Sequence, residues 1–137
     1  MFRYGNARRD RSHCFAQIRP EIGRRAQVTL ARLRLGCSDL AASRARTDHS
    51  VSPLCKCGVR VDETVQHFLL ECPLLCAPRS VMFENVRLAL SDISLPVDPF
   101  SLLCVLLGTS EHRISRGARL AVVRAVFSFV IASKRRV

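Results

Sequence analysis

The sequence predicts a mainly α fold: a small helical domain with a zinc knuckle, made of a Cys-x-Cys turn and a short helix. Three observations support this prediction. Apolar residues recur at helical spacing along most of the chain, and no segment alternates apolar and polar residues as a strand would, beyond a small turn at the cysteines. Three cysteines and a histidine gather within residues 55–72. The chain of 137 residues has the length of one ordinary domain.

The first half of the chain predicts two helices. Residues 1–20 are basic and lack a sustained hydrophobic period, so we expect them to be mostly irregular. Residues 21–35 have a helical pattern, and Gly36 follows where a left-handed residue commonly ends a helix. The face expected to be buried holds Val28, Leu30, Ala31, Leu33 and Leu35. Ser38 is the expected N-cap of a short second helix that continues to about residue 46.

The second half predicts three more helices after the cysteine-rich block. One spans about residues 78–90, a short apolar helix spans 100–107 and ends at Gly108, and the last spans about 115–133. Residues 91–99 contain two prolines and form the expected linker. In the helix of residues 78–90, the residues expected to be buried are Val81, Val86, Leu88 and Leu90.

These elements suggest a simple domain organisation. We expect a zinc-knuckle domain over residues 21–90. The apolar helices of residues 100–137 are expected to pack on the same domain after the linker of residues 91–99, and the basic segment of residues 1–20 precedes it. Neither an internal repeat nor a low-complexity segment is present in the sequence.

The charge of the chain is strongly positive and lies at its two ends. Twenty-two basic residues against eleven acidic ones give +11. Residues 1–46 carry eleven basic and three acidic residues (+8), residues 47–100 carry four and seven (−3), and residues 101–137 carry seven and one (+6). Most of the cations are arginines, whose planar guanidinium suits bidentate contact with phosphate. RNA or DNA is therefore the first partner to expect, although a GC-rich genome would also raise the arginine count.

Cysteine usage and hydropathy indicate the compartment. Seven cysteines are present, and residues 1–20 contain no apolar run of secretory length, so we expect reduced thiols or metal ligation in place of a disulfide framework. The most apolar stretch, residues 120–132, is too short for a bilayer and is interrupted by Arg124. We therefore expect an intracellular protein, nuclear or cytoplasmic, without a membrane partner.

Four residues have the spacing of a structural zinc site: Cys55, Cys57, His67 and Cys72. Zinc prefers four soft or borderline ligands in a tetrahedron, and three cysteines with one histidine form a standard structural set. Two cysteines one residue apart can face the same ion if the backbone turns tightly, and Gly58 permits such a turn. On an ideal helix, residues five apart such as His67 and Cys72 are separated by about 140°, so they converge only if the helix ends near residue 70.

Other interpretations of these residues stay open at this point. Free cysteines often serve only as small buried hydrophobes, and this interpretation suits Cys14, Cys37 and Cys104. By spacing alone, Cys76 could replace His67 as the fourth ligand. Within the block, Asp62 is the expected N-cap of a helix over residues 63–70.

The residues around this block resemble a known family. Three stretches carry the resemblance: LARLRLG (30–36), SPLCKCG (52–58) and ETVQHFLLECP (63–73). They are similar to the C-terminal region of non-LTR retrotransposon polyproteins, where a Cys-Cys-His-Cys (CCHC) zinc knuckle follows the reverse transcriptase domain. The resemblance is strong over residues 27–79 and weak but in register over residues 96–134. It implies a bound Zn²⁺ and favours His67 over Cys76, because the family places a histidine there.

The residues that build polymerase and nuclease active sites are missing from the sequence. Reverse transcription needs paired aspartates that hold two metal ions, whereas the adjacent acids here are Asp62 and Glu63. The eleven acidic residues show no cluster of the kind that RNase H or endonuclease chemistry needs, and no glycine-rich phosphate loop occurs. We therefore expect no catalytic residues and no enzyme, only a fragment of a reverse transcriptase polyprotein without its catalytic domains.

The sequence thus predicts zinc-dependent binding of RNA or DNA. The expected phosphate contacts are Arg32, Arg34, Arg44, Arg46, Lys56 and Arg60. One alternative is a zinc-stabilised interaction module that docks a protein partner on the apolar face of residues 118–131. A second alternative is a transposon relic without retained function.

Overall fold

The computed structural model describes residues 21–109 and 113–137, so the predicted basic segment of residues 1–20 lies outside the described residues. The elements, in order, are α2 (Arg24–Leu35), α3 (Ala41–Ala45), the π-helical turn η2 (His67–Glu71), the 3₁₀ turn η3 (Pro73–Leu75), α4 (Cys76–Ala89), α5 (Pro99–Leu106) and α6 (Arg116–Ala132). Within the described residues there is no strand, and an isolated antiparallel bridge pairs Leu54 with Asp62. The prediction of a small, mainly helical domain is confirmed.

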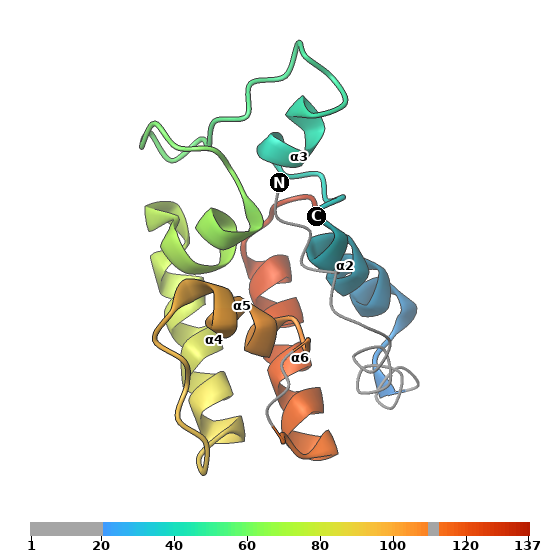
Figure 1. Cartoon of the computed structure of the whole chain (residues 1–137), viewed down its shortest axis with the longest axis vertical. Helices are drawn as coiled ribbons and strands as arrows, with labels where there is room; N and C mark the ends of the chain where they lie inside the picture. The colour runs from blue at the N-terminus through green and yellow to red at the C-terminus, as the bar shows by residue number, and fades with distance from the viewer. Residues whose placement is uncertain (1–20, 110–112) are drawn as a thin grey trace.

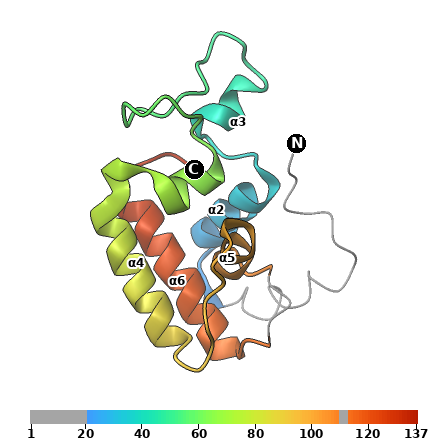
Figure 2. The ribbon, with the colours of Figure 1, turned by 60° about the vertical axis from the view of Figure 1, so that its left-hand side comes forward.

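Helix α6 is the centre of the packing. It contacts α4, α2 and α5, with α4 as its most extensive neighbour. In Figure 1, α4 descends on one side of α6, α6 ascends beside it, and α2 lies on the other side. Figure 2 shows the same pairing of α4 and α6, with α3 and the loops around it at the end where the C-terminus also lies. The cysteine-rich block therefore sits at one end of the helical core.

Three helix ends follow local capping rules, and the one at Gly36 was predicted from the sequence. Gly36 ends α2 with φ 64° and donates its amide to the carbonyl of Leu33 at 3.3 Å. Ser115 caps α6, because its hydroxyl accepts a hydrogen bond from the amide of Ala118 at 3.2 Å. Asp98 caps α5 in the same way, through the amide of Ser101 at 3.0 Å. The predicted bounds of α5 and α6 are thus confirmed to within one or two residues.

The prediction of which faces are buried was partly wrong. On α2, Leu30 and Leu33 are fully buried as predicted, but Leu35 is 63% exposed. On α4, Val86 is buried whereas Leu88 is 73% exposed. Val28 of α2 and Val81 of α4 were also expected in the core and are exposed. The buried faces of the two helices include residues that were not predicted to be buried: Ala26 and Thr29 of α2, and Met82 of α4. Both helices carry two overlapping apolar stripes, and the packing partner selects one of them.

The second helix is shorter than predicted and begins differently. It starts at Ala41, and its first amide donates to the Oε2 atom of Glu63 at 2.8 Å. Ser38 is buried and lies with its hydroxyl 3.3 Å from that of Ser43, so it does not cap the helix. The cap of α3 thus comes from a residue far along the chain, which local sequence patterns could not reveal.

Two buried phenylalanines connect the cysteine-rich block to the core. Phe68 of η2 and Phe129 of α6 are 1% and 2% exposed, and their ring centroids lie 5.2 Å apart with the planes tilted by 59°. Such tilted aromatic pairs are a favourable geometry. The residues of α6 that are buried include Val122, Val126 and Val130, so its apolar face packs inside the domain.

In the described part of the chain, no helix has the length and apolar character to cross a bilayer.

Candidate metal centre

A closed loop presents the first two candidate ligands. The amide of Cys55 donates to the carbonyl of Val61 at 2.8 Å, and the amide of Glu63 donates to the carbonyl of Pro53 at 2.8 Å. Between these bonds the chain reverses at Gly58, whose φ of 85° is disfavoured for residues with a Cβ. The predicted Cys-x-Cys turn is therefore present, and it holds Cys55 and Cys57 on one side of the loop.

A π-helical turn presents the other two candidate ligands. The amide of Cys72 donates to the carbonyl of His67 at 2.7 Å, an i→i+5 bond in place of the i→i+4 bond of an α-helix. This bond widens the turn by one residue, which brings residues five apart closer to the same side of the turn. The 140° separation expected on an ideal helix is thereby reduced, and Pro73 follows directly to end the turn.

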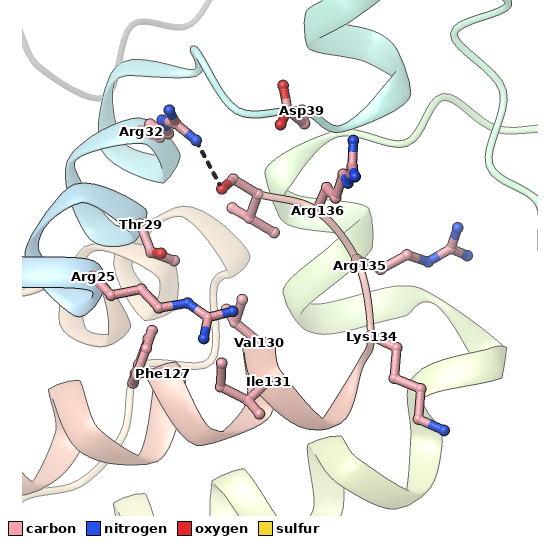
Figure 3. Close-up of a pocket in the computed structure, with 11 residues that line it drawn as sticks. Arg25, Thr29, Arg32, Asp39, Phe127, Val130, Ile131, Lys134, Arg135 and Arg136 are labelled. Atoms are coloured by element: carbon pink, nitrogen blue, oxygen red, sulfur yellow. Dashed lines mark hydrogen bonds between the residues drawn. The ribbon is translucent and has the colours of Figure 1, made fainter.

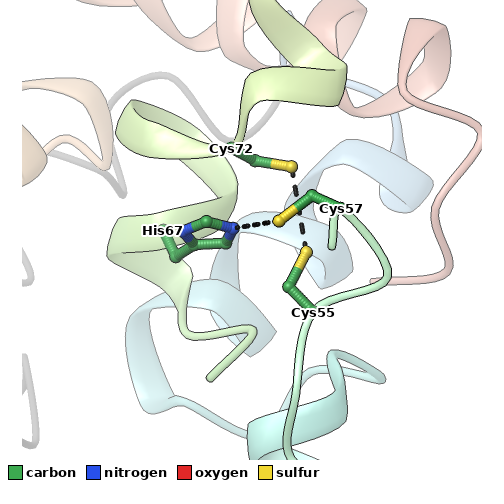
Figure 4. A group of neighbouring side chains, drawn as sticks. All are labelled: Cys55, Cys57, His67 and Cys72. Atoms are coloured by element: carbon green, nitrogen blue, oxygen red, sulfur yellow. Dashed lines mark hydrogen bonds between the residues drawn. The ribbon is translucent and has the colours of Figure 1, made fainter. Parts of the chain in front are cut away.

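The four predicted ligands lie together in the structure. The Sγ atoms of Cys55 and Cys72 are 3.8 Å apart, and the Sγ of Cys57 lies 3.5 Å from Nε2 of His67. All four ligand atoms lie within 4.8 Å of one another, so the group could hold a metal ion. Figure 4 shows the two cysteines of the loop facing the histidine and the cysteine of the helical turn. Cys55, His67 and Cys72 are buried, and Cys57 is half-buried.

The two cysteines of the loop differ in acidity. Burial raises the pKa of the Cys55 thiol to about 12, with a further contribution from the neighbouring thiols. For Cys57, desolvation raises the pKa, but backbone hydrogen bonding at Val59 and the neighbouring thiols outweigh it and keep the pKa below its ordinary value. Thiols bind metal as thiolates, so ligation must displace the proton of Cys55, whereas the lowered pKa of Cys57 favours its thiolate form.

Carboxylates surround the ligands, and sequence analysis missed their roles. The Oε2 atom of Glu71 lies 3.7 Å from Nδ1 of His67, on the ring edge opposite the sulfur atoms. A carboxylate there favours the proton on Nδ1 and leaves Nε2 free for a metal. Glu63 is 7% exposed, and its Oε1 lies 4.0 Å from the Sγ of Cys55 and 3.4 Å from Nη1 of Arg135. In the sequence, Glu63 was noted only as the neighbour of Asp62 and as the first residue of the motif of residues 63–73.

Thr64, and not Asp62, caps the helical turn that carries His67. The amide of His67 donates to the hydroxyl of Thr64 at 3.1 Å. Asp62 is exposed and forms the bridge with Leu54 through its backbone. The predicted cap was therefore wrong by two residues, because the bridge to Leu54 keeps the chain extended at Asp62.

We expect Thr64→Ala to destabilise the metal-loaded protein by about 1 kcal/mol, the usual cost of losing an N-cap. Asp62→Ala is the matched control and should stay within about 0.5 kcal/mol of the wild type, as surface substitutions do. Urea denaturation of both variants measures the difference. Equal effects of the two substitutions would show that the hydroxyl of Thr64 does not cap the turn.

The other cysteines described lie outside the cluster. Cys76 is exposed at the start of α4, Cys37 is exposed, and Cys104 is half-buried in α5. Cys76 therefore does not join the four clustered residues in this structure. Cys14 lies outside the described residues.

Some of the predicted phosphate contacts donate to backbone carbonyls of the domain, and most of them are exposed. Arg34 donates to the carbonyl of Leu107, and burial, followed by the charge of Arg119, lowers its pKa to about 10. Arg46 donates to the carbonyl of Gly36. These two guanidiniums contact the backbone of the domain itself. Arg32 also donates to a backbone carbonyl, that of Val137 at 3.4 Å. The predicted contacts that are exposed are Arg32, Arg44, Arg46, Lys56 and Arg60.

A further cation lies beside the metal centre. Arg79 of α4 donates through Nη2 to the carbonyl of Cys72, the residue that follows η2. This contact ties the end of the ligand-bearing turn to α4. The i+7 spacing of Cys72 and Arg79 gives no sequence signal for it.

Comparison of the chain with protein-family models, with curated proteins and with solved structures yielded no significant match.

Proposed function

We propose that this chain is a zinc-dependent nucleic-acid-binding module without chemistry of its own. The observation that carries the proposal is the convergence of four Cys and His ligand atoms within 4.8 Å in a chain of net charge +11. Zinc with three thiolates and one imidazole is a standard structural centre, and such centres contribute directly to folding.

The distances support zinc as the metal. In a tetrahedron with Zn–S bonds of about 2.3 Å, sulfur atoms lie about 3.8 Å apart, and a sulfur and an imidazole nitrogen lie about 3.6 Å apart. The separation of the sulfur atoms of Cys55 and Cys72 is 3.8 Å, and that of the Cys57 sulfur and the His67 nitrogen is 3.5 Å. Hard cations such as Mg²⁺ and Ca²⁺ prefer oxygen ligands, which do not belong to this cluster.

The origin of the module is part of the proposal. The stretches over residues 30–36, 52–58 and 63–73 resemble the C-terminal knuckle region of non-LTR retrotransposon polyproteins. We propose that the chain derives from such a polyprotein and assists a polymerase by holding template RNA or target DNA. The genomic flank tests this origin: an adjacent reading frame for a reverse transcriptase would support it, and unrelated flanking genes would contradict it.

Salt-dependent binding tests the nucleic-acid function. If the exposed cations neutralise several phosphates, the affinity for a generic oligonucleotide should fall with salt, with a log–log slope of magnitude roughly 3 to 6. Fluorescence anisotropy of a labelled 20-nucleotide strand at several salt concentrations gives this slope. Zinc removal with a chelator should weaken binding, because the loop and η2 lose their common anchor.

Two results would contradict the proposed function. Absence of binding at low salt would exclude a nucleic-acid partner. A salt-independent affinity that also survives zinc removal would indicate association through apolar surface, as in an interaction module for proteins.

A further inference from the structure

A basic hollow lies between α2 and the segment that follows α6. Its volume is about 510 Å³, within the usual range of pockets for small ligands. Side chains of α6, namely Phe127, Val130 and Ile131, form its apolar side. Arg25 and Arg32 extend from α2 toward it, and residues 134–137 border it from the other direction (Figure 3).

The charge around this hollow is strongly unbalanced. Five cationic side chains line it, Arg25, Arg32, Lys134, Arg135 and Arg136, against one acidic side chain, that of Asp39. Arg135 forms an ion pair with Glu63 at 3.4 Å, and its side chain points away from α2. The other four cations are exposed, and no carboxylate of the described residues forms an ion pair with them.

The segment after α6 reaches this position through an unusual backbone conformation. Lys134 has φ 53°, the left-handed conformation that usually requires glycine. This residue reverses the chain, and Arg32 then donates through Nη1 to the carbonyl of Val137 at 3.4 Å. A glycine would reverse the chain with less strain, whereas lysine adds a cation at the border of the hollow.

The metal centre and this segment share one residue. Glu63 Oε1 lies 4.0 Å from the Sγ of Cys55 and 3.4 Å from Nη1 of Arg135. Loss of metal would free the loop that positions Glu63, and with it the anchor of residues 134–137. This contact would link a metal held by the four clustered residues to the segment that borders the hollow.

We propose, on the basis of the proposed function, that this hollow is the site for single-stranded nucleic acid. Arg25, Arg32, Lys134 and Arg136 contact successive phosphates, and an unstacked base packs on Phe127 and Ile131. Cationic grooves with an aromatic side chain are the usual means of binding single strands. In a duplex the bases are paired inside the helix, so a duplex can use the cations but not the apolar side.

The test compares two double variants of equal charge by anisotropy with labelled 20-nucleotide oligo(dT). Arg25→Gln with Arg136→Gln should lower the affinity at least about tenfold and reduce the salt slope by about 1.4, for two phosphates on a single strand. Arg87→Gln with Arg113→Gln removes two exposed cations elsewhere and should change the affinity less than about threefold. Unchanged zinc content and circular dichroism confirm that both variants are folded.

Two further variants test the backbone reversal and the base contact. Lys134→Gly keeps the left-handed conformation, so it should weaken binding by charge loss alone. Phe127→Leu keeps an apolar side chain and should weaken single-strand binding about fivefold or more while leaving duplex binding unchanged. Equal losses for single strand and duplex in Phe127→Leu would overturn the base contact.

Other outcomes distinguish a failure of the proposed site at the hollow from a failure of the proposed nucleic-acid binding. One such outcome is that the double variant Lys56→Gln with Arg60→Gln abolishes binding while Arg25→Gln with Arg136→Gln leaves it unchanged. That result would exclude the hollow as the binding site but would leave the proposed nucleic-acid binding intact. If thymidine monophosphate competes as well as the oligonucleotide at equal nucleotide concentration, the site takes mononucleotides and the single-strand assignment is overturned. If the wild type binds no oligonucleotide, the proposed function itself fails.

Discussion

Cys57→Ser and His67→Ala are each expected to abolish zinc binding and to unfold the loop of residues 53–63 together with η2. Structural zinc contributes roughly 10–16 kcal/mol in small zinc-finger peptides, as much as the whole stability of a typical domain. Leu54, Val59 and Val61 of the loop are exposed, so a bound metal would be its principal link to η2. Metal analysis of the purified variants should find no zinc, against one equivalent in the wild type.

The helical core should survive the loss of metal. Leu30, Val86 and Val126 are fully buried in helices that contribute no ligand. We therefore expect hydrogen-exchange protection to vanish over residues 53–72 and to persist in α4 and α6. Global unfolding of both variants at 25 °C would show that the metal supports the entire domain and not only one end of it.

Cys76→Ser is the matched control for the ligand variants. Cys76 lies four residues beyond Cys72, is exposed, and is excluded from the cluster by the geometry of the four ligand atoms. The variant should retain one equivalent of zinc and the stability of the wild type. Loss of zinc in this variant, or zinc retained after both Cys57→Ser and His67→Ala, would contradict the assigned ligand set.

The sequence predicted the four clustered residues but not the conformation that brings them together. Soft ligand types at close spacing around Gly58 are a local signal and can be recognised directly. The π-helical turn between His67 and Cys72 has no comparable signal, because an i→i+5 bond depends on what the turn contacts. A metal ion bound by both His67 and Cys72 would favour a π-helical turn, because both side chains must then lie on the same side of η2.

Glu63 and Arg34 show why tertiary roles escape prediction. In the sequence, Glu63 is one acid beside another, and Arg34 is one arginine in a basic stretch. In the fold, Glu63 caps α3 and pairs with Arg135, whereas Arg34 donates to the carbonyl of Leu107. Each partner lies more than twenty residues away, so no helical or strand period reports the contact. The helix end at Gly36 was predicted correctly because the left-handed residue and the carbonyls that it caps lie within one turn.

Phe68→Ala is expected to destabilise the protein by about 3–5 kcal/mol, the usual cost of removing a buried phenylalanine. Phe68 is 1% exposed, packs against Phe129 of α6, and is adjacent to the candidate ligand His67. The cavity left by the substitution would loosen η2 as well as the core. Since a domain of this size has a total stability of about 5–15 kcal/mol, this single change removes a large share of it.

Urea denaturation of Phe68→Ala, Phe129→Ala and the double variant, each with zinc bound, measures the contact between the two rings. The losses should fall short of additivity by about 0.5–1.5 kcal/mol, the coupling of an aromatic pair. Phe68→Leu fills most of the cavity and should cost less than either alanine variant. Phe129→Ala leaves the ligand-bearing turn itself intact, so a lower zinc affinity in this variant would show that packing on α6 holds His67 in place. Additive losses, or a cost below about 1 kcal/mol for Phe68→Ala, would contradict the role of this pair in joining the metal centre to the helical core.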